Sequence, residues 1–294
     1  MADEIEPFTI GVDGAALGDL GERLRRTRWP ERQTVGDWSQ GVPLGYLQDL
    51  CGYWASRYDW RAAEARINQI PQFMTRIDGL DVHFLHLRSP HPDATPLIMT
   101  HGLIPPLAPP DRNADDLTSR ERAALADLDE RGRTGSGYSA EHGTRPQTIG
   151  YSLTDSPAGL CAWIVEKLWA WTDHPGDLSQ VLTADQVLDN ISLYWLTGTG
   201  ASSARLYWES ITQVTDWFTT ATHDVITVPA GCSIFPKEVP RPSRRQAQRR
   251  FANIVYWNEP SRGGHFAAWE QPALFIDEVR AVARSCHHHP CQPA

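Results

Sequence analysis

The apolar positions at the start of the chain follow the period of an α-helix. Leucines fall on one face of residues 15–29, and the pattern ends at Trp29-Pro30, because proline disfavours helix in the residue before it. A second apolar stripe spans 44–58, and a short helical pattern follows at 61–68. The sequence therefore predicts three helices in this part of the chain.

The period then changes to that of strands. Apolar runs at 72–77 and 82–87 flank Asp78-Gly79, a dipeptide that favours a two-residue hairpin turn. The run PLIMT at 96–100 predicts a buried strand that ends at His101-Gly102. Catalytic loops of α/β proteins commonly follow the carboxyl ends of strands, so a functional loop is expected after this one.

The middle of the chain is helical and aromatic. Helices are predicted to begin at 118, 157, 183 and 202, and the sequence GSGYS predicts a glycine-rich loop between the first two. Polar capping residues mark three of these helix starts: Thr118 with Glu121, Ser156 before Pro157, and Thr183 with Gln186. This stretch is expected to form a lid or cap.

Strand signals return at 224–231 and 253–257, and each is followed by a loop and a helix. The second of these helices is predicted over 272–284. Strands at both ends of the chain with helices between them predict an α/β fold that carries a helical insertion.

Composition narrows the class of function. Hydrophobic residues make up 41% and charged residues 21% of the 294, which is ordinary for a soluble protein. The net charge of -9 argues against a nucleic-acid partner, which would need a basic surface. No run approaches the roughly 20 apolar residues of a membrane span, and the N-terminus carries no secretion signal. A cytoplasmic protein is expected.

The five cysteines have no CxxC spacing, which predicts reduced thiols and no disulfide framework. The tail CHHHPC at 286–291 is expected to be an unstructured end and no metal site. Neither a metal nor another cofactor is expected. The basic run RPSRRQAQRR at 241–250 predicts the solvated face of a short helix, with contact to an acidic partner as the alternative.

The strongest candidate for chemistry is His265, in the sequence RGGHFAAWEQP between the last predicted strand and helix. Two glycines before it permit a sharp bend of the backbone, so the imidazole can point into a cleft. A carboxylate behind a catalytic imidazole fixes its tautomer and stabilises the imidazolium. Glu238 follows the preceding strand and is the preferred partner, with Asp224 and Glu259 as rivals.

Several long stretches of the chain resemble the epoxide hydrolases of the microsomal type. Residues 5–102 resemble that family's N-terminal segment, through RRTRWP, WASRYDWR and RIDGLDVHFLH. Later stretches resemble its cap and C-terminal half in the same order: GSGYSAEHGTRPQTIGYSLTDSPAGLCAWIVEKLWAWT, NISLYWLTGTGASSARLYWE, FPKE and GGHFAAWEQP. The resemblance implies an α/β-hydrolase-like parallel or mixed sheet, incomplete in its centre, with a helical cap.

The resemblance also implies roles for individual residues. Tyr138 and Tyr207 would hold and protonate the epoxide oxygen, Glu238 would orient the imidazole, and His265 would activate water. Phenols suit the first task, because each is a neutral donor near pH 7 that stabilises a developing alkoxide. Without the resemblance, both tyrosines would be interpreted as packing aromatics.

The chain departs from the family at the nucleophile. After His101-Gly102 the family's oxyanion loop and its Asp-bearing nucleophile elbow do not follow, so two or three strand–helix units, about 60 to 100 residues, are expected to be absent. The sequence Gly11-Val-Asp13-Gly-Ala15 matches an elbow pattern, but no strand precedes it. Gly159-Leu-Cys161 lies inside a predicted helix. No nucleophile is identified.

The expected organisation has five parts. They are an N-terminal segment with the first strands (1–102), a linker (103–117), a helical cap (118–222), the C-terminal part of the core (223–285) and a disordered tail (286–294). A central parallel sheet that has lost inner strands exposes unpaired edges, so low solubility or homo-oligomerisation is expected.

Two functions remain open at this stage. The first is an epoxide hydrolase that converts small apolar epoxides and water to vicinal diols through a covalent ester, in detoxification or aromatic hydrocarbon catabolism. The second is a catalytically inactive remnant or fragment with at most a pocket for apolar ligands. Another α/β-hydrolase fits less well, since an esterase needs a serine elbow and no G-x-S-x-G is present.

Overall fold

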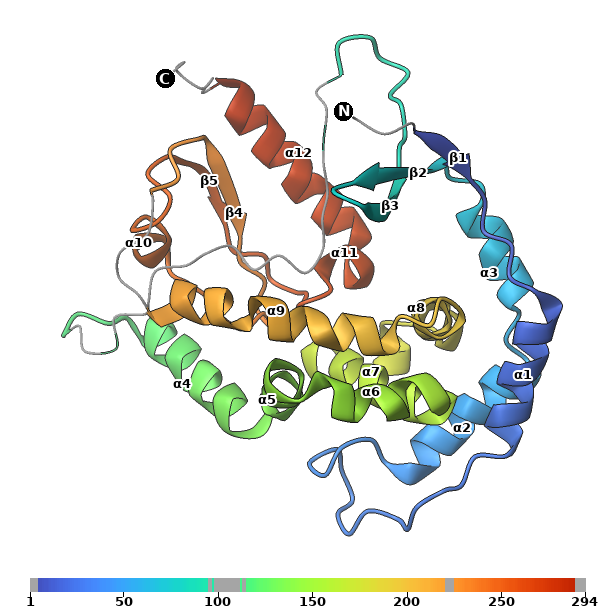
Figure 1. The fold of residues 1–294 in the computed structure, drawn as a ribbon. Helices are drawn as coiled ribbons and strands as arrows, with labels where there is room; N and C mark the ends of the chain where they lie inside the picture. The colour runs from blue at the N-terminus through green and yellow to red at the C-terminus, as the bar shows by residue number, and fades with distance from the viewer. Residues whose placement is uncertain (1–4, 95–96, 98–111, 113–114, 220–224, 289–294) are drawn as a thin grey trace.

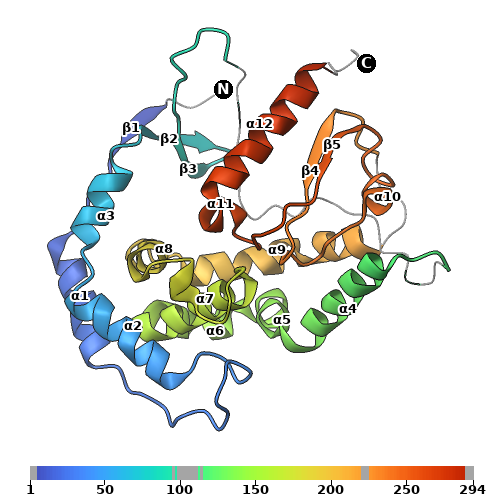
Figure 2. The same ribbon diagram turned by 180° about the vertical axis from the view of Figure 1, so that it is seen from behind.

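The computed structural model describes residues 5–94, 97, 112, 115–219 and 225–288. In Figure 1 the helices from the middle of the chain lie below two small sheets, and the C-terminal helix is drawn between these sheets in both views (Figure 2). The predicted strand at 96–100, His101-Gly102 and most of the linker lie outside the described residues.

The three predicted N-terminal helices are confirmed, as α1 (Gly14–Arg25), α2 (Leu44–Ser56) and α3 (Trp60–Ile67). Helix α1 ends four residues earlier than expected, and the chain runs on through Trp29-Pro30 without regular structure. Helices α1 and α2 pack against each other and against a long helix of the cap.

The predicted hairpin is also confirmed. Strands β2 (Gln72–Ile77) and β3 (Leu80–Leu85) pair antiparallel, and β1 (Glu6–Phe8) adds to the other side of β2. Asp78 and Gly79 have φ of 51° and 82°, the two positive values that a type I′ turn requires.

The cap contains more helix than the sequence predicted. Its α-helices are α4 (Ser119–Thr134), α5 (Gly137–Thr144), α6 (Pro146–Asp155), α7 (Pro157–Trp171), α8 (Ala184–Leu196) and α9 (Gly200–Thr219), with a short 3-10 turn at Leu178–Gln180. The capping boxes at Thr118 and Thr183 are both present, and the Ser156 side chain caps α7.

The predicted glycine-rich loop around GSGYS is wrong. Gly135 ends α4 and Ser136 precedes α5, so the loop shrinks to this junction and Tyr138 lies in the first turn of a helix. The glycine is used as a helix end, which is its usual role after the last turn.

The main hydrophobic core belongs to helices. Its buried residues come from α1 and α2, from α6 to α9, and from the turn before α8. Leu188, Ile191 and Val165 are completely buried at its centre. The N-terminal helices and the cap thus share one core, which does not include residues of β1–β5.

The C-terminal part contains β4 (Ala230–Ser233), β5 (Ile254–Asn258), α10 (Arg244–Ala247), α11 (Ala267–Glu270) and α12 (Pro272–His288). The strands pair in parallel, and α12 packs against both. An added Cβ at Gly231 would lie 2.4 Å from Val282, so this helix approaches the sheet very closely.

Two predictions for the C-terminal part need correction. The strand predicted at 224–231 begins only at Ala230, and Ile226 makes an isolated bridge to Phe251 instead. Pro229, which has no N–H to donate, directly precedes Ala230, the first residue of β4. The last helix continues to His288 although a tail was expected from 286, and Cys286 contacts the Pro229 carbonyl.

The basic run is held within the chain. Arg245 pairs with Glu121 and Asp116, and Arg241 pairs with Asp127. These ion pairs join the segment around α10 to α4 and the residues before it. The predicted short helix is present, but Arg245 on it and Arg241 before it bind acidic groups of this chain.

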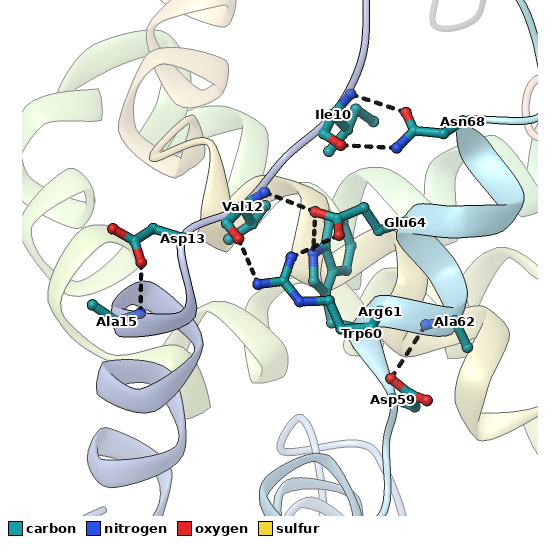
Figure 3. A network of polar contacts seen from close by, with 10 residues as sticks. All are labelled: Ile10, Val12, Asp13, Ala15, Asp59, Trp60, Arg61, Ala62, Glu64 and Asn68. Carbon is teal, nitrogen blue, oxygen red and sulfur yellow. Dashed lines mark hydrogen bonds and ion pairs between the residues drawn. The ribbon is translucent and has the colours of Figure 1, made fainter.

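A polar network joins the segment that precedes α1 to helix α3 (Figure 3). Glu64, 9% exposed, accepts hydrogen bonds from Val12 N (2.7 Å), Arg61 Nη1 (2.6 Å) and Trp60 Nε1 (3.3 Å). Asn68 makes a two-way pair with the backbone of Ile10. The bond from Val12, with those from Arg61 and Trp60, lowers the pKa of Glu64 below its ordinary 4.5 against the effect of burial.

We expect Glu64→Gln to reduce the free energy of unfolding at pH 7 by about 1–3 kcal/mol, because charge-assisted hydrogen bonds are lost. A carboxylate whose pKa is lower in the folded than in the unfolded state stabilises the folded state fully at a pH above the unfolded-state pKa. This stabilisation is lost as the pH falls through the folded-state pKa. The difference between wild type and variant should therefore shrink below about pH 4.5. Urea unfolding across pH 7 to 3 measures it; a constant difference would contradict the assignment.

Candidate active site

The imidazole of His265 and the carboxylate of Glu238 are in direct contact. Nδ1 of His265 lies 3.1 Å from Oε1 and 3.0 Å from Oε2 of Glu238. Glu238 follows β4 and His265 precedes α11. The side chain of His265 is 24% exposed and that of Glu238 is 31% exposed. Because an ionised carboxylate only accepts hydrogen bonds, this contact calls for a proton on Nδ1 of the imidazole.

Of the two rival carboxylates, Glu259 is bound elsewhere. Glu259 is bound by Arg120 and accepts a hydrogen bond from Trp257 Nε1 at 3.1 Å. Asp224 lies outside the described residues. Glu238 is also fixed locally, because Oε1 accepts a hydrogen bond from Val239 N at 2.7 Å.

The backbone around His265 is held by the end of α7. His265 N donates to the carbonyl of Trp171 at 2.9 Å. Gly264 has no room for a side chain, since an added Cβ would lie 2.4 Å from that same carbonyl oxygen. Gly263 has φ of 111°, which favours glycine. The sequence pair Gly-Gly therefore serves close backbone approach as well as the expected bend.

Tyr138 and Tyr207 form a second pair. Their ring centroids are 5.7 Å apart in an edge-to-face arrangement, with Tyr138 on α5 and Tyr207 on α9. Burial raises the pKa of Tyr207, and the charge and hydrogen bond of Tyr138 raise it further. Both effects keep the Tyr207 phenol protonated, as a hydrogen-bond donor must be.

Trp171 links the two pairs. Its ring lies 5.4 Å from that of Tyr138 and 5.1 Å from that of His265, measured between centroids. The guanidinium of Arg131 lies 4.5 Å over the Trp171 ring, and Lys167 Nζ lies 4.6 Å over the Tyr138 ring. These cations favour negative charge that develops near the phenols.

His142 was not anticipated in the sequence. Its ring contacts both Tyr138 and Tyr207, at 5.9 Å and 5.0 Å, and it is almost completely buried. Trp163 Nε1 donates to its Nε2 at 3.1 Å, and burial lowers its pKa. A neutral, proton-accepting imidazole therefore packs behind the tyrosines. A histidine four residues after a tyrosine on one helix face was the available signal.

The candidate nucleophiles lie elsewhere. Asp13 is the N-cap of α1 and accepts a hydrogen bond from Ala15 N (Figure 3). Cys161 is completely buried inside α7. Within the described ranges, no group of three or more His, Cys, Asp or Glu side chains is arranged to hold a metal ion. The chemistry that these residues support is proton transfer and oxyanion stabilisation.

Comparison with known proteins decides the family. Residues 5–105 match the family model described as "Epoxide hydrolase N terminus". The "Putative epoxide hydrolase" of Stigmatella aurantiaca (strain DW4/3-1) is 38% identical over 379 residues, covering 95% of this chain and 85% of the relative. The chain belongs to the epoxide hydrolase family.

Solved structures of epoxide hydrolases share the fold. Aspergillus niger epoxide hydrolase matches with a TM-score of 0.82 at 24% identity, covering 96% of this chain and 97% of that chain. Juvenile hormone epoxide hydrolase from the silkworm Bombyx mori matches with a TM-score of 0.83 at 20% identity, covering 97% and 95%. The predicted fold class is confirmed: this chain has an α/β-hydrolase fold in incomplete form.

The alignment with the Stigmatella aurantiaca relative shows that this chain lacks internal residues that the relative has. The 379 aligned positions exceed its 294 residues by 85, so at least 85 of those positions hold no residue of this chain. This agrees with the expected loss of two or three strand–helix units.

Among the helices of the described segments, none combines the length and apolar character needed to cross a membrane.

We expect Gly264→Ala to lower the free energy of unfolding by about 1–3 kcal/mol, because the added methyl group displaces the Trp171 carbonyl or the His265 loop. Gly18→Ala is the matched control, since Gly18 lies within α1 with open space around it. That change should stabilise by about 0.5–1 kcal/mol through helix propensity. Urea unfolding measures both, and equal effects in the two variants would contradict the close approach.

Proposed function

We propose that this protein hydrolyses small apolar epoxides to vicinal diols, with His265 as the base and Glu238 as its orienting acid. Tyr138 and Tyr207 donate hydrogen bonds to the epoxide oxygen. The supporting observation is that Trp171 contacts both Tyr138, which pairs with Tyr207, and an imidazole paired with a carboxylate. Family membership and the names of the relatives support the substrate class.

The proposed roles give each proton a direction. With the proton on Nδ1 shared with Glu238, Nε2 of His265 carries the lone pair that accepts a proton from water. Glu238 stabilises the imidazolium that forms. The phenols supply hydrogen bonds, and one of them supplies a proton, to the oxygen released as the epoxide opens. Arg131 and Lys167 favour that transient negative charge.

The covalent route through an ester requires a nucleophilic carboxylate, and no residue is assigned to that role. Acid–base assistance contributes about 10²–10⁴-fold, whereas loss of a nucleophile in serine hydrolases costs about 10⁶-fold. The gap of at least 85 aligned positions therefore favours a second candidate function, a protein that binds apolar ligands without turning them over.

Incubation of the purified chain with styrene oxide, followed by chromatography of the diol, tests the first function. We expect diol formation that His265→Ala abolishes and that Tyr207→Phe reduces by about 10²-fold, since only the hydroxyl is removed. No diol at high protein concentration would overturn it. Saturable quenching of tryptophan fluorescence by styrene oxide, without turnover, would support the second function instead.

We also propose that the chain self-associates through its incomplete sheet. Leu80 and Leu85 are exposed on β3, which has no further neighbour among the described strands. Such an edge is a template for pairing with another chain. We expect sedimentation to give a mass above 32.9 kDa, and Leu85→Lys to reduce it. Leu206→Lys, at an exposed position of α9, is the control; a monomer in wild type would contradict the proposal.

A further inference from the structure

Glu270 is a buried carboxylate that binds backbone instead of a cation. It is 7% exposed, and it accepts hydrogen bonds from three main-chain N–H groups. Oε2 accepts from Gly264 N and Asp173 N, both at 2.8 Å, and Oε1 accepts from Phe266 N at 2.9 Å. Two of these donors are the immediate neighbours of His265 in the chain.

The N–H groups of residues 263–266 all donate hydrogen bonds. Gly263 N donates to Asp173 Oδ2 at 2.8 Å, and His265 N donates to the Trp171 carbonyl at 2.9 Å. Together with the two bonds to Glu270, these contacts hold four successive peptide units against the end of α7. The direction of the His265 side chain follows from the orientation of these units.

Burial raises the pKa of Glu270, and the bonds from Asp173, Phe266 and Gly264 oppose that effect. An uncompensated buried charge is costly, so three donors converging on one carboxylate make its ionised form tolerable. An amide in its place offers a single acceptor oxygen. Its NH2 group would face at least one of the three N–H donors.

We propose that Glu270 is a positioning residue for His265, which holds the imidazole against Glu238 by binding the peptide units on either side of it. The relevance to catalysis rests on the proposed function. The geometric effect does not, because it concerns only which nitrogen of His265 carries the proton. Loss of the contact with Glu238 removes the preference for the Nδ1–H tautomer.

The test is nitrogen NMR of the full chain labelled with ¹⁵N-histidine, at about pH 8, above the ordinary histidine pKa of about 6.5. His265→Gln identifies the resonances of His265 among those of the 11 histidines. We expect wild type to show the Nδ1–H tautomer at His265. Glu270→Gln should show both tautomers in comparable amounts.

Glu278→Gln is the matched control. Glu278 is also 7% exposed and also accepts three hydrogen bonds, but from side chains of the β4–β5 region: Ser233 Oγ, Tyr256 OH and Asn258 Nδ2. This variant should lose stability to urea as Glu270→Gln does, while the His265 tautomer stays as in wild type. A merely structural role of Glu270 would make the two variants alike.

The proposal is overturned if Glu270→Gln keeps the wild-type tautomer, or if Glu278→Gln changes it equally. If Glu270→Gln does not fold, Glu270→Asp keeps the charge with a shorter reach and is judged by the same criterion. If wild type forms no diol while Glu270→Gln changes the tautomer, the proposed function alone fails. Diol formation with an unchanged tautomer would count against the positioning role alone.

Discussion

A hydrogen bond from His265 N to the Trp171 carbonyl joins the loop of the base to the helical cap. The phenols lie on α5 and α9, whereas Glu238 and His265 lie on loops next to the β4–β5 sheet. The Trp171 ring contacts the rings of Tyr138 and His265, and the Trp171 carbonyl also accepts the hydrogen bond from His265 N. This tie acts together with the hydrogen bonds of Asp173 and the ion pairs of Arg241 and Arg245 in setting the base relative to the phenols.

The location of the core explains how such a site persists in a shortened chain. The large buried cluster is built from α1, α2 and the cap helices, and it draws nothing from β1–β5. In an ordinary α/β protein the parallel sheet is the buried centre. Here the cap carries its own apolar interior, and α7 and α9, the helices of Trp171 and Tyr207, contribute buried residues to it.

Local signals in the sequence were enough for the helix caps, the hairpin and the pairing of His265 with Glu238. The caps and the hairpin are determined by a few adjacent residues. The pairing was predicted from the motif around His265 and from the position of Glu238 after a strand. The helix at Tyr138 was missed because its glycines also serve as helix ends. The strand β4 begins later than predicted, directly after Pro229. The bond of His265 N to the Trp171 carbonyl and the bond of Asp173 N to Glu270 join distant parts of the chain, which periodicity does not reveal.

Packing of α1 and α2 on α7, and of α3 on α8, has a further consequence for the connection between residues 94 and 115. Chain on both sides of it contributes buried residues to one interior, from α1 and α2 before the connection and from α6 to α9 after it. The entropy of closing a loop rises only logarithmically, by about 0.6 kcal/mol for each doubling of its length. Evolution could therefore shorten or lengthen this connection at small thermodynamic expense, leaving the helical domain as a stable remainder.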